Sequence, residues 1–309
     1  MASFCHKTLQ KYSAAIQHEE TFMIVICVLN FLFSIASTLG NLIVIHALWK
    51  ASSIPANLKK LFLSLAFSDL AIGLIIQPTS AVTLAVMLNM AADGNYDFDR
   101  FCPSVITVAT VCTSFVVGAS FSTITAIAMD RYLALFIHLR YQELVTEKRV
   151  NIALLISWVN SAVVACAFSA LPSNNDMVAV AFVSVGLLIL TVVYFRIYKV
   201  ARYHRNQIQC QNQFQNDEVR EVARVRKSAL NAFYVYIISL LCYVPNLLVS
   251  ILLEFYNLAV PILAIYFLST VLLFLNSSLN PLVYCWRYRE VRNIVKNTVL
   301  KMVTYNNAE

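Results

Sequence analysis

One carboxylate in this sequence stands inside a long apolar stretch, and residues that could partner it are spread along the chain. Asp69 interrupts the otherwise uncharged segment 61–92. A buried ionisable group is costly and is usually functional. Carboxylate, amide and hydroxyl oxygens suit a small hard cation. The sequence therefore predicts either a site for a small hard cation or a hydrated polar network without an ion, formed by Asp69, Ser120, Asn41, Asn276 and Asn280.

A second polar group follows the uncharged segment 101–129 directly and consists of Asp130, Arg131 and Tyr132. If this segment is a helix, 18 residues separate Thr113 from Arg131, a rise of roughly 27 Å. Four residues spaced seven, four and seven apart would then lie on one face that runs along the whole helix: Thr113, Ser120, Ile124 and Arg131.

Arg131 has two interpretations. An arginine at a span end is often only a topology determinant that extends to the membrane interface. The adjacent acid and tyrosine favour another role, in which Asp130 neutralises Arg131 and holds an off state. Further along the chain, Pro281 removes a backbone donor next to Asn280, so a kink there predicts a hinge.

Composition indicates what kind of element carries these residues. Of 309 residues, 60% are hydrophobic and 13% are charged, against roughly a quarter charged in a soluble domain. About 20 apolar residues cross a bilayer as a helix. Apart from 61–92, the uncharged stretches of that length are 21–49, 101–129, 150–175, 177–195, 228–253 and 255–286. We expect an all-α bundle of seven transmembrane helices.

The distribution of charge predicts the orientation. The net charge of +7 is spread between apolar runs and does not form the basic face of a nucleic-acid-binding domain. With the amino terminus outside, all Lys and Arg except Lys7, Lys11 and Arg100 lie on the inner side, as the positive-inside rule requires. We expect an extracellular segment 1–21, a seven-transmembrane domain 22–286 and a cytoplasmic segment 287–309.

The last segment has the pattern of an eighth, amphipathic helix on the inner membrane face. Arg289, Arg292, Lys296 and Lys301 alternate with an apolar stripe that suits an anionic lipid surface, made of Val291, Ile294, Val295, Val299 and Met302. Segment 196–227 is polar, and we expect cytoplasmic extensions of the fifth and sixth spans around a mobile middle.

Taken together, these motifs resemble the rhodopsin-like (class A) G-protein-coupled receptors over about 22–303. Each match is weak alone, but their order on successive spans is specific. They are Gly40-Asn41, Leu65-Ala66, Ser68-Asp69-Leu70, Asp130-Arg131-Tyr132, Trp158, Tyr194, Cys242, Pro245 and Asn280-Pro281-Leu282-Val283-Tyr284. The loop with Leu139-Arg140-Tyr141 most resembles the group holding adenosine, melanocortin and cannabinoid receptors.

The resemblance implies a mechanism. The Asp69 site resembles the family's allosteric sodium site, and Arg131 would swing to meet a heterotrimeric G protein. Leu139 would dock into its α subunit. The switch would comprise Asp130, Arg131, Tyr132, Leu139, Tyr194, Tyr243, Pro245, Asn280, Pro281 and Tyr284.

The sequence departs from the family pattern at four positions. Tyr243 stands where the family has Trp, and Gly186 where it has Pro. Val225 replaces the acid that would hold Arg131 from the sixth span, which suggests raised basal activity. Cys102 lies one turn before the usual disulfide position and either pairs with Cys5 or stays free.

The ligand is not fixed by the sequence. The third span has no acid for a biogenic amine, since Thr113 stands in its place, and Phe274 replaces the lysine that would bind retinal. A lipid, a small neutral molecule or a peptide all fit the neutral pocket expected from Gln77, Thr113, Ser114, Val117, Tyr243, Asn246, Ser250, Tyr266 and Thr270.

Other function classes fit less well. An ion-coupled transporter could use Asp69, but no internal repeat supports it. An intramembrane protease would need a second facing aspartate or a Ser and His pair, so no enzyme activity is expected. No cofactor is expected to be required, and the sodium ion that the resemblance implies would be an allosteric ligand. We expect a plasma-membrane protein with an outer ligand, a G protein and membrane lipids as partners.

Overall fold

The structure is a computed structural model that describes residues 16, 18–93, 107–137, 140–170, 176–210, 217–255 and 260–306. Those residues form helices and turns, with no strand among them. Seven of the helices are long and apolar enough to cross a membrane: Glu20–Lys50, Ala56–Asn89, Thr107–Phe136, Glu147–Ala167, Val183–Val200, Ala232–Leu253 and Pro261–Arg287. The predicted all-α fold of seven spans is confirmed.

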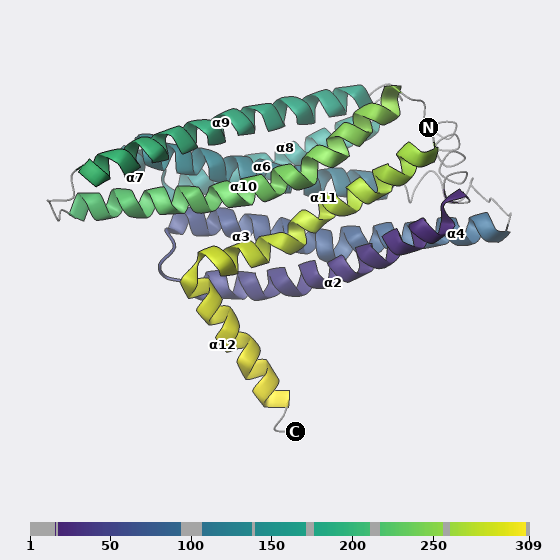
Figure 1. The fold of residues 1–309 in the computed structure, drawn as a ribbon, viewed down its shortest axis with the longest axis horizontal. Helices are drawn as coiled ribbons and strands as arrows, with labels where there is room; N and C mark the ends of the chain where they lie inside the picture. Colours follow the sequence, from purple (N-terminus) through teal and green to yellow (C-terminus); the bar gives the residue numbers. More distant parts are fainter. Residues whose placement is uncertain are drawn as a thin grey trace.

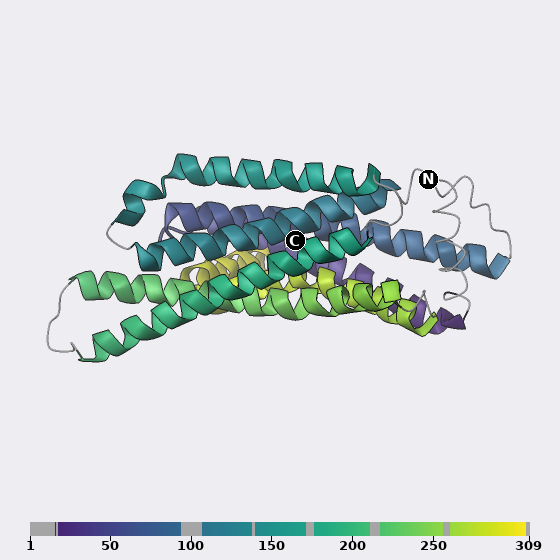
Figure 2. The ribbon, with the colours of Figure 1, turned by 90° about the horizontal axis from the view of Figure 1, so that it is seen from above.

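The spans run side by side as one elongated bundle (Figures 1 and 2). The helices are α2 (Glu20–Lys50), α3 (Ala56–Ala71), η1 (Ile72–Ile76), α4 (Gln77–Asp93), α6 (Thr107–Phe136), α7 (Tyr141–Leu144), α8 (Glu147–Ala170), α9 (Asp176–Cys210), α10 (Asp217–Phe255), α11 (Val260–Arg287) and α12 (Arg289–Asn306). We call the end that carries α7 and the start of α12 the inner end, and the opposite end the outer end (Figure 1).

Apolar side chains cover the outside of the bundle. On α8 the exposed residues recur every three or four positions, as Ile152, Leu155, Ile156, Val159 and Val163. Each is more than half exposed. Such a stripe would be unfavourable in water, because monomeric soluble proteins rarely expose large apolar patches. It fits a lipid-facing surface, whereas the few polar residues of the spans point inward.

The second span is not a uniform α-helix, because a π-helical turn, η1, separates α3 from α4. Gly73 in this turn lies so close to α2 that an added Cβ would be 2.8 Å from the Ser37 Cβ and from the Thr38 backbone nitrogen. Ser34 donates to the Gly73 carbonyl at 2.7 Å and Ser37 to the Asp69 carbonyl at 3.0 Å. The first span thus satisfies carbonyls next to the π turn.

The largest apolar core lies toward the inner end and contains Leu48, Phe62, Tyr194 and Tyr284, together with Val291 from α12. A smaller cluster near the outer end includes Met23, Leu84 and Val271. Between them, the indole of Trp158 on α8 donates to the Ser64 hydroxyl on α3 at 3.0 Å. The polar residues discussed below are held between these packed regions.

The final helix, α12, leaves the inner end at an angle to the spans (Figure 1). Val291 is fully buried, while Ile294 and Val295 pack partly against the inner core. Val299 is 41% exposed, and the side chain of Met302 lies outside the described residues. The predicted eighth helix is therefore present, and its first two turns provide the apolar contact with the bundle.

Candidate functional site

A polar core lies at the centre of the bundle around Asp69, in the last turn of α3. The Asp69 side chain is fully buried. Asn280 on α11 donates to its Oδ2 at 2.7 Å. The hydroxyls of Ser120 on α6 and Ser277 on α11 face the carboxylate without making a hydrogen bond of ordinary geometry. Three spans therefore converge on one carboxylate.

Several oxygen atoms of this core have no hydrogen-bond partner within the described part of the chain. They are Asp69 Oδ1, Asn41 Oδ1, Ser120 Oγ, Ser277 Oγ and Asn280 Oδ1. A buried polar atom without a partner costs about 1–3 kcal/mol, so such groups normally hold ordered water or an ion. All five are oxygens and one is a carboxylate, which is the ligand chemistry of a small hard cation.

The two remaining amides of the predicted site are anchored to neighbouring helices. Asn41 on α2 donates to the Ser277 carbonyl at 3.0 Å and to the Ser37 carbonyl at 2.9 Å. Asn276 accepts from the Ser239 hydroxyl of α10 at 3.0 Å. The Asn276 oxygen thus links α11 to α10, and the unpartnered oxygens come from the other four predicted residues and Ser277.

Tyr243 on α10 closes the outer side of this core. Its side chain is buried and its hydroxyl faces Ser120 and Asp69. The Phe121 ring lies 5.8 Å from the Tyr243 ring. Phe121 also occupies the space at Gly186 of α9, where an added Cβ would be 3.0 Å from Phe121 Cε1. The glycine therefore lets a ring of α6 fill the gap between α9 and Tyr243.

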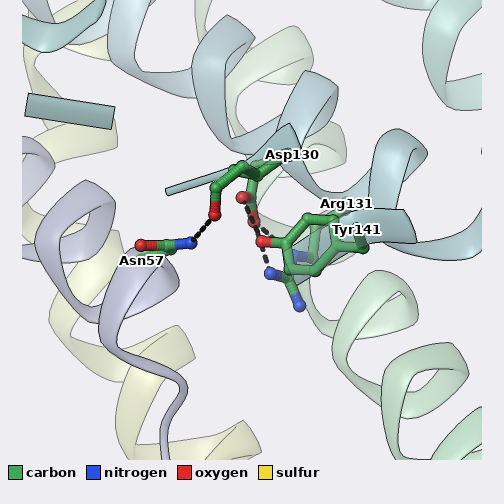
Figure 3. Close-up of polar contacts among 5 residues, drawn as sticks. Asn57, Asp130, Arg131 and Tyr141 are labelled. Atoms are coloured by element: carbon green, nitrogen blue, oxygen red, sulfur yellow. Dashed lines mark hydrogen bonds and ion pairs between the residues drawn. The ribbon is translucent and has the colours of Figure 1, made fainter. Parts of the chain in front are cut away.

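At the inner end, Arg131 pairs with its neighbour Asp130, and both side chains are buried. Arg131 Nε donates to Asp130 Oδ2 at 2.9 Å, and Nη2 bonds the same oxygen. The other oxygen, Oδ1, accepts from the Tyr141 hydroxyl of α7 at 2.6 Å (Figure 3). Each oxygen of Asp130 thus has its own partner.

The loop that carries Tyr141 is itself held against the bundle. Asn57, at the start of α3, donates to the Val145 carbonyl at 2.7 Å, close to the Asp130 and Tyr141 contact (Figure 3). Burial, followed by the charge of Asp130, raises the pKa of Tyr141 to about 12. The hydroxyl therefore stays protonated, and remains a donor, throughout the physiological range.

The aromatic residues of the predicted switch pack near this pair. Tyr194 on α9 stacks on Tyr236 of α10 with ring centroids 4.2 Å apart. Its hydroxyl donates to the Ala232 carbonyl at 3.2 Å. Tyr284 on α11 packs against Phe62 at 5.0 Å, and its buried hydroxyl has no hydrogen-bond partner among the described residues. Tyr194 and Tyr284 are thus held by different helices.

The remaining predicted switch residues either make few described contacts or lie outside the described residues. Pro245 and Pro281 lie inside continuous helices, α10 and α11. Tyr132 stacks on Phe136 at 5.5 Å, on a neighbouring turn of α6. Leu139 and both cysteines of the predicted pair, Cys5 and Cys102, lie outside the described residues, as does the side chain of Val225.

Near the outer end, the predicted ligand residues fall into two groups. On α10 and α11 they form one cluster, in which Asn246 donates to Ser269 and Thr270 at 3.2 Å each. Elsewhere Gln77 is fully buried, and neither of its amide atoms has a partner among the described residues. Val117 and Thr113 are half-buried and Ser114 is exposed.

Four residues of these sites were not predicted from the sequence. Ser277 shares a helix face with Asn280, three residues away, so helical spacing could have identified it. Ser239 and Ser269 contact predicted residues on a neighbouring helix, which no spacing along the chain reveals. Tyr141 on α7 lies eleven positions from Asp130, and its place in the sequence carries no signal of their contact.

Comparisons with known proteins agree with this geometry. The profile of the family described as 7 transmembrane receptor (rhodopsin family) matches residues 40–179. Adenosine receptor A2a from Homo sapiens is 27% identical over 306 residues, covering 87% of this chain and 71% of that receptor. Adenosine receptor A3 from Ovis aries is 23% identical, covering 84% and 85%, and adenosine receptor A2b from Gallus gallus is 23% identical, covering 89% and 88%.

Proposed function

The chain belongs to the rhodopsin-like seven-transmembrane receptors and is related to their adenosine group, and we propose that it activates a heterotrimeric G protein through Arg131. Signalling through G proteins is the function of this family. In the proposed mechanism, a ligand that binds at the outer end changes the pairing of Arg131 at the inner end.

The buried Asp130 and Arg131 pair is the observation that supports this proposal most directly. The guanidinium is only 2% exposed and its charge is balanced by a carboxylate that Tyr141 also holds. A buried pair of this kind is costly to separate unless another partner replaces the one that is lost. A G protein inserting at the inner end could supply that partner, so the pair defines an off state.

The on state would require movement of the inner halves of α9, α10 and α11. Tyr194 now rests on Tyr236 of α10, so an outward swing of α10 would release it. The buried hydroxyl of Tyr284 has no hydrogen-bond partner in the part of the chain that the structure describes. Released toward Arg131, the two phenols could support its guanidinium in the extended position. Pro245 and Pro281 are the places where α10 and α11 can bend.

The experiment compares guanine-nucleotide exchange by purified G proteins of each α-subunit family with the receptor in nanodiscs. Arg131→Ala should remove receptor-dependent exchange. Arg149→Ala is the matched control, because Arg149 is an exposed arginine near the same end whose side chain donates to the Leu144 carbonyl at 2.7 Å. Equal exchange by wild type and Arg131→Ala would remove Arg131 from the mechanism.

We also propose that the Asp69 core binds a sodium ion. Asp69 and Ser120 supply two of its oxygens, with Asn41, Asn280 and Ser277 completing the polar lining. Among the described residues no group of three or more His, Cys, Asp and Glu could hold a metal, so the donor set favours a hard monovalent cation over a transition metal. A bound ion would hold α2, α3, α6 and α11 together in the off state.

Sodium binding predicts a stability difference between salts. Replacing sodium chloride by choline chloride at equal ionic strength should lower the melting temperature of the wild type by a few degrees, by mass action. Asp69→Asn should be insensitive to the exchange, because it removes the charge and keeps the shape. A wild type that melts identically in both salts would favour the water network instead.

The ligand is proposed to be a small neutral molecule that enters at the outer end. The stretches 107–129 of α6, 228–253 of α10 and 260–286 of α11 carry no charged residue, and Glu254 stands only in the last turn of α10. An ammonium group would lose several kcal/mol of solvation there, which argues against amines. Because the relatives are named adenosine receptors, adenosine is the first probe, to be tested for an increase in nucleotide exchange.

The orientation follows as a proposal from the same charge distribution: amino terminus outside, carboxyl terminus in the cytosol, in the plasma membrane. The basic face of α12 would rest on anionic lipids. The transporter alternative has no support, since the relatives found are receptors.

A further inference from the structure

The inner halves of α10 and α11 are joined by an arginine that lies against two aromatic rings. The Arg287 guanidinium carbon is 4.3 Å from the centroid of the Tyr234 ring on α10 and 4.9 Å from the centroid of the Trp286 ring on α11. The two rings meet edge to face, with centroids 5.2 Å apart. A cation within about 6 Å of a Trp or Tyr face is attracted by the ring quadrupole. The three side chains therefore form one cation–π cluster.

This cluster lies where the apolar surface of the spans gives way to the charged inner end. Leu241 and Leu282 lie one or two turns further into the spans and are 68% and 65% exposed. Trp286 and Tyr234 are also on the outer surface, and Arg287 is the last residue of α11. Trp and Tyr side chains are typical of the membrane interface. Because lipid excludes part of the water there, the attraction between the guanidinium and the rings is stronger than at a fully hydrated surface.

The contact of Arg287 with Tyr234 joins two helices, whereas its contact with Trp286 stays within one. Tyr234 lies 11 residues before Pro245, on the part of α10 that the proposed bend would move. Those residues form an arm of roughly 16 Å. A bend of about 20° at the proline would shift Tyr234 by roughly 6 Å, which takes its ring out of reach of the guanidinium. Only the Tyr234 contact therefore depends on the position of α10.

From this geometry we propose that the Tyr234–Arg287 contact holds α10 against α11 and thereby stabilises the off state of the receptor. It rests on the proposed receptor function and adds two positioning residues to it. The Asp130 and Arg131 pair belongs to α6 alone, so it does not itself tie α10 to a neighbouring span. The Tyr234–Arg287 contact supplies such a tie at the lipid-facing side of the bundle.

Arg287 also has a simpler role that has to be separated from this one. A cation in the last turn of a helix is favourable to the helix dipole, and that effect needs no partner on α10. Loss of the arginine would then lower stability equally whether or not Tyr234 is present. A cation–π contact, in contrast, is lost once, whichever partner is removed.

The first test measures nucleotide exchange without ligand, with the receptor in nanodiscs. Tyr234→Leu and Arg287→Gln should each raise basal exchange about twofold to tenfold, the range expected when a cation–π contact is removed from one state of a two-state switch. Tyr234→Phe should stay near the wild-type rate, because phenylalanine keeps the ring face. In the presence of Arg131→Ala the increase should disappear.

Phe195→Leu is the matched control for these variants. Phe195 is an exposed aromatic residue of α9, and the Lys199 Nζ lies 4.7 Å from the centroid of its ring. That cation–π contact lies within one helix and moves with it, so its loss should leave basal exchange unchanged. An increase in Phe195→Leu as large as that in Tyr234→Leu would overturn the inference, because any loss of an aromatic side chain from the lipid-facing surface would then suffice.

The second test is a double-mutant cycle of melting temperatures, which needs no G protein. The combined variant Tyr234→Leu and Arg287→Gln should lose clearly less than the sum of the two single losses, because both remove the same contact. Additive losses, or unchanged basal exchange in both single variants, would overturn the inference. If wild type lacks Arg131-dependent exchange while the losses are coupled, the proposed function fails and the contact is only structural.

Discussion

The Tyr141 hydroxyl donates to the carboxylate that pairs with Arg131, and we predict that the state of Arg131 depends on this contact. It holds Oδ1 of Asp130 at 2.6 Å and leaves Oδ2 turned toward the guanidinium. Hydrogen bonds to a charged group contribute about 1.5–3 kcal/mol each. A contact of that size at a two-state switch shifts its equilibrium by about tenfold or more.

Tyr141→Phe should therefore raise basal nucleotide exchange severalfold, because Asp130 is no longer held in the geometry that pairs with Arg131. The pKa of Tyr141 is about 12, so its hydroxyl does not ionise between pH 6 and 8, and the excess over wild type should be constant across that range. Tyr198→Phe, a 43%-exposed tyrosine of α9, is the control and should behave as wild type. Basal exchange that is unchanged in Tyr141→Phe would contradict this role.

At this scale the sequence predicts residues inside spans better than residues in loops. Asp69 and Asn280 could be matched from the sequence because polar groups in apolar helices are scarce and must find each other. Their bond of 2.7 Å joins residues 211 positions apart. Tyr141 could not be matched to Asp130, because its position depends on a short helical turn whose placement is set by tertiary contacts such as Asn57 with Val145.

The number and the approximate limits of the membrane-spanning helices can be predicted from the thickness of the bilayer. Irregular turns within a span cannot be predicted in this way. Charge-free stretches predicted the spans because a helix of fixed rise must cross a layer of fixed width. The π turn at Ile72–Ile76 could not be predicted in this way. It depends on the close approach of Gly73 to α2 and on donors from Ser34 and Ser37, which are contacts between helices.

The start of α12 is attached to the turn between α2 and α3 by one carboxylate. Glu290 accepts from the backbone nitrogens of Ser52 and Ser53 at 2.9 and 2.8 Å, and from the hydroxyls of both serines. These hydrogen bonds, the Ser52 backbone first, lower the pKa of Glu290 to about 2. Glu290 thus fixes where α12 begins, in addition to the apolar contact of Val291.

Glu290→Gln should lower the melting temperature of the receptor by a few degrees, because a neutral amide accepts these hydrogen bonds more weakly than a carboxylate. The depressed pKa means that the stabilisation is fully present above the ordinary value of 4.5 and is lost as pH falls toward 2. The difference from wild type should therefore be the same at pH 6 and pH 8.

Glu143→Gln is the matched control for that measurement. Glu143 is an exposed acid of α7 at the same end of the bundle, and no hydrogen bond or ion pair of its side chain is seen among the described residues. It should leave the melting temperature unchanged. If Glu143→Gln lowered the melting temperature as much as Glu290→Gln does, the effect would come from removing a negative charge near this end. It would then not come from losing the attachment of α12.

The orientation of the whole molecule in the membrane depends on the distribution of charge along the sequence, which the packing of the helices does not alter. The described inner end carries Lys50, Lys59 and Lys60 beside α2 and α3, and Arg287, Arg289 and Arg292 at the start of α12. Cationic side chains near short loops resist translocation across the membrane. The same bundle inserted the other way up would have identical internal contacts, so only this asymmetry distinguishes the two orientations.

The prediction is that a peptide tag ahead of Met1 binds antibody on intact cells, whereas a tag after Glu309 binds only after the membrane is permeabilised. The reason is energetic: each Lys or Arg placed near the anionic inner leaflet gains about 1 kcal/mol, and reversal would lose this for most of the 23 such residues. Replacing Lys50, Lys59 and Lys60 by Gln should increase the reversed fraction, since these residues flank the first loop to be retained. Staining of the carboxyl-terminal tag on intact cells would contradict the orientation and would place Arg131 on the side of the membrane where no G protein can reach it.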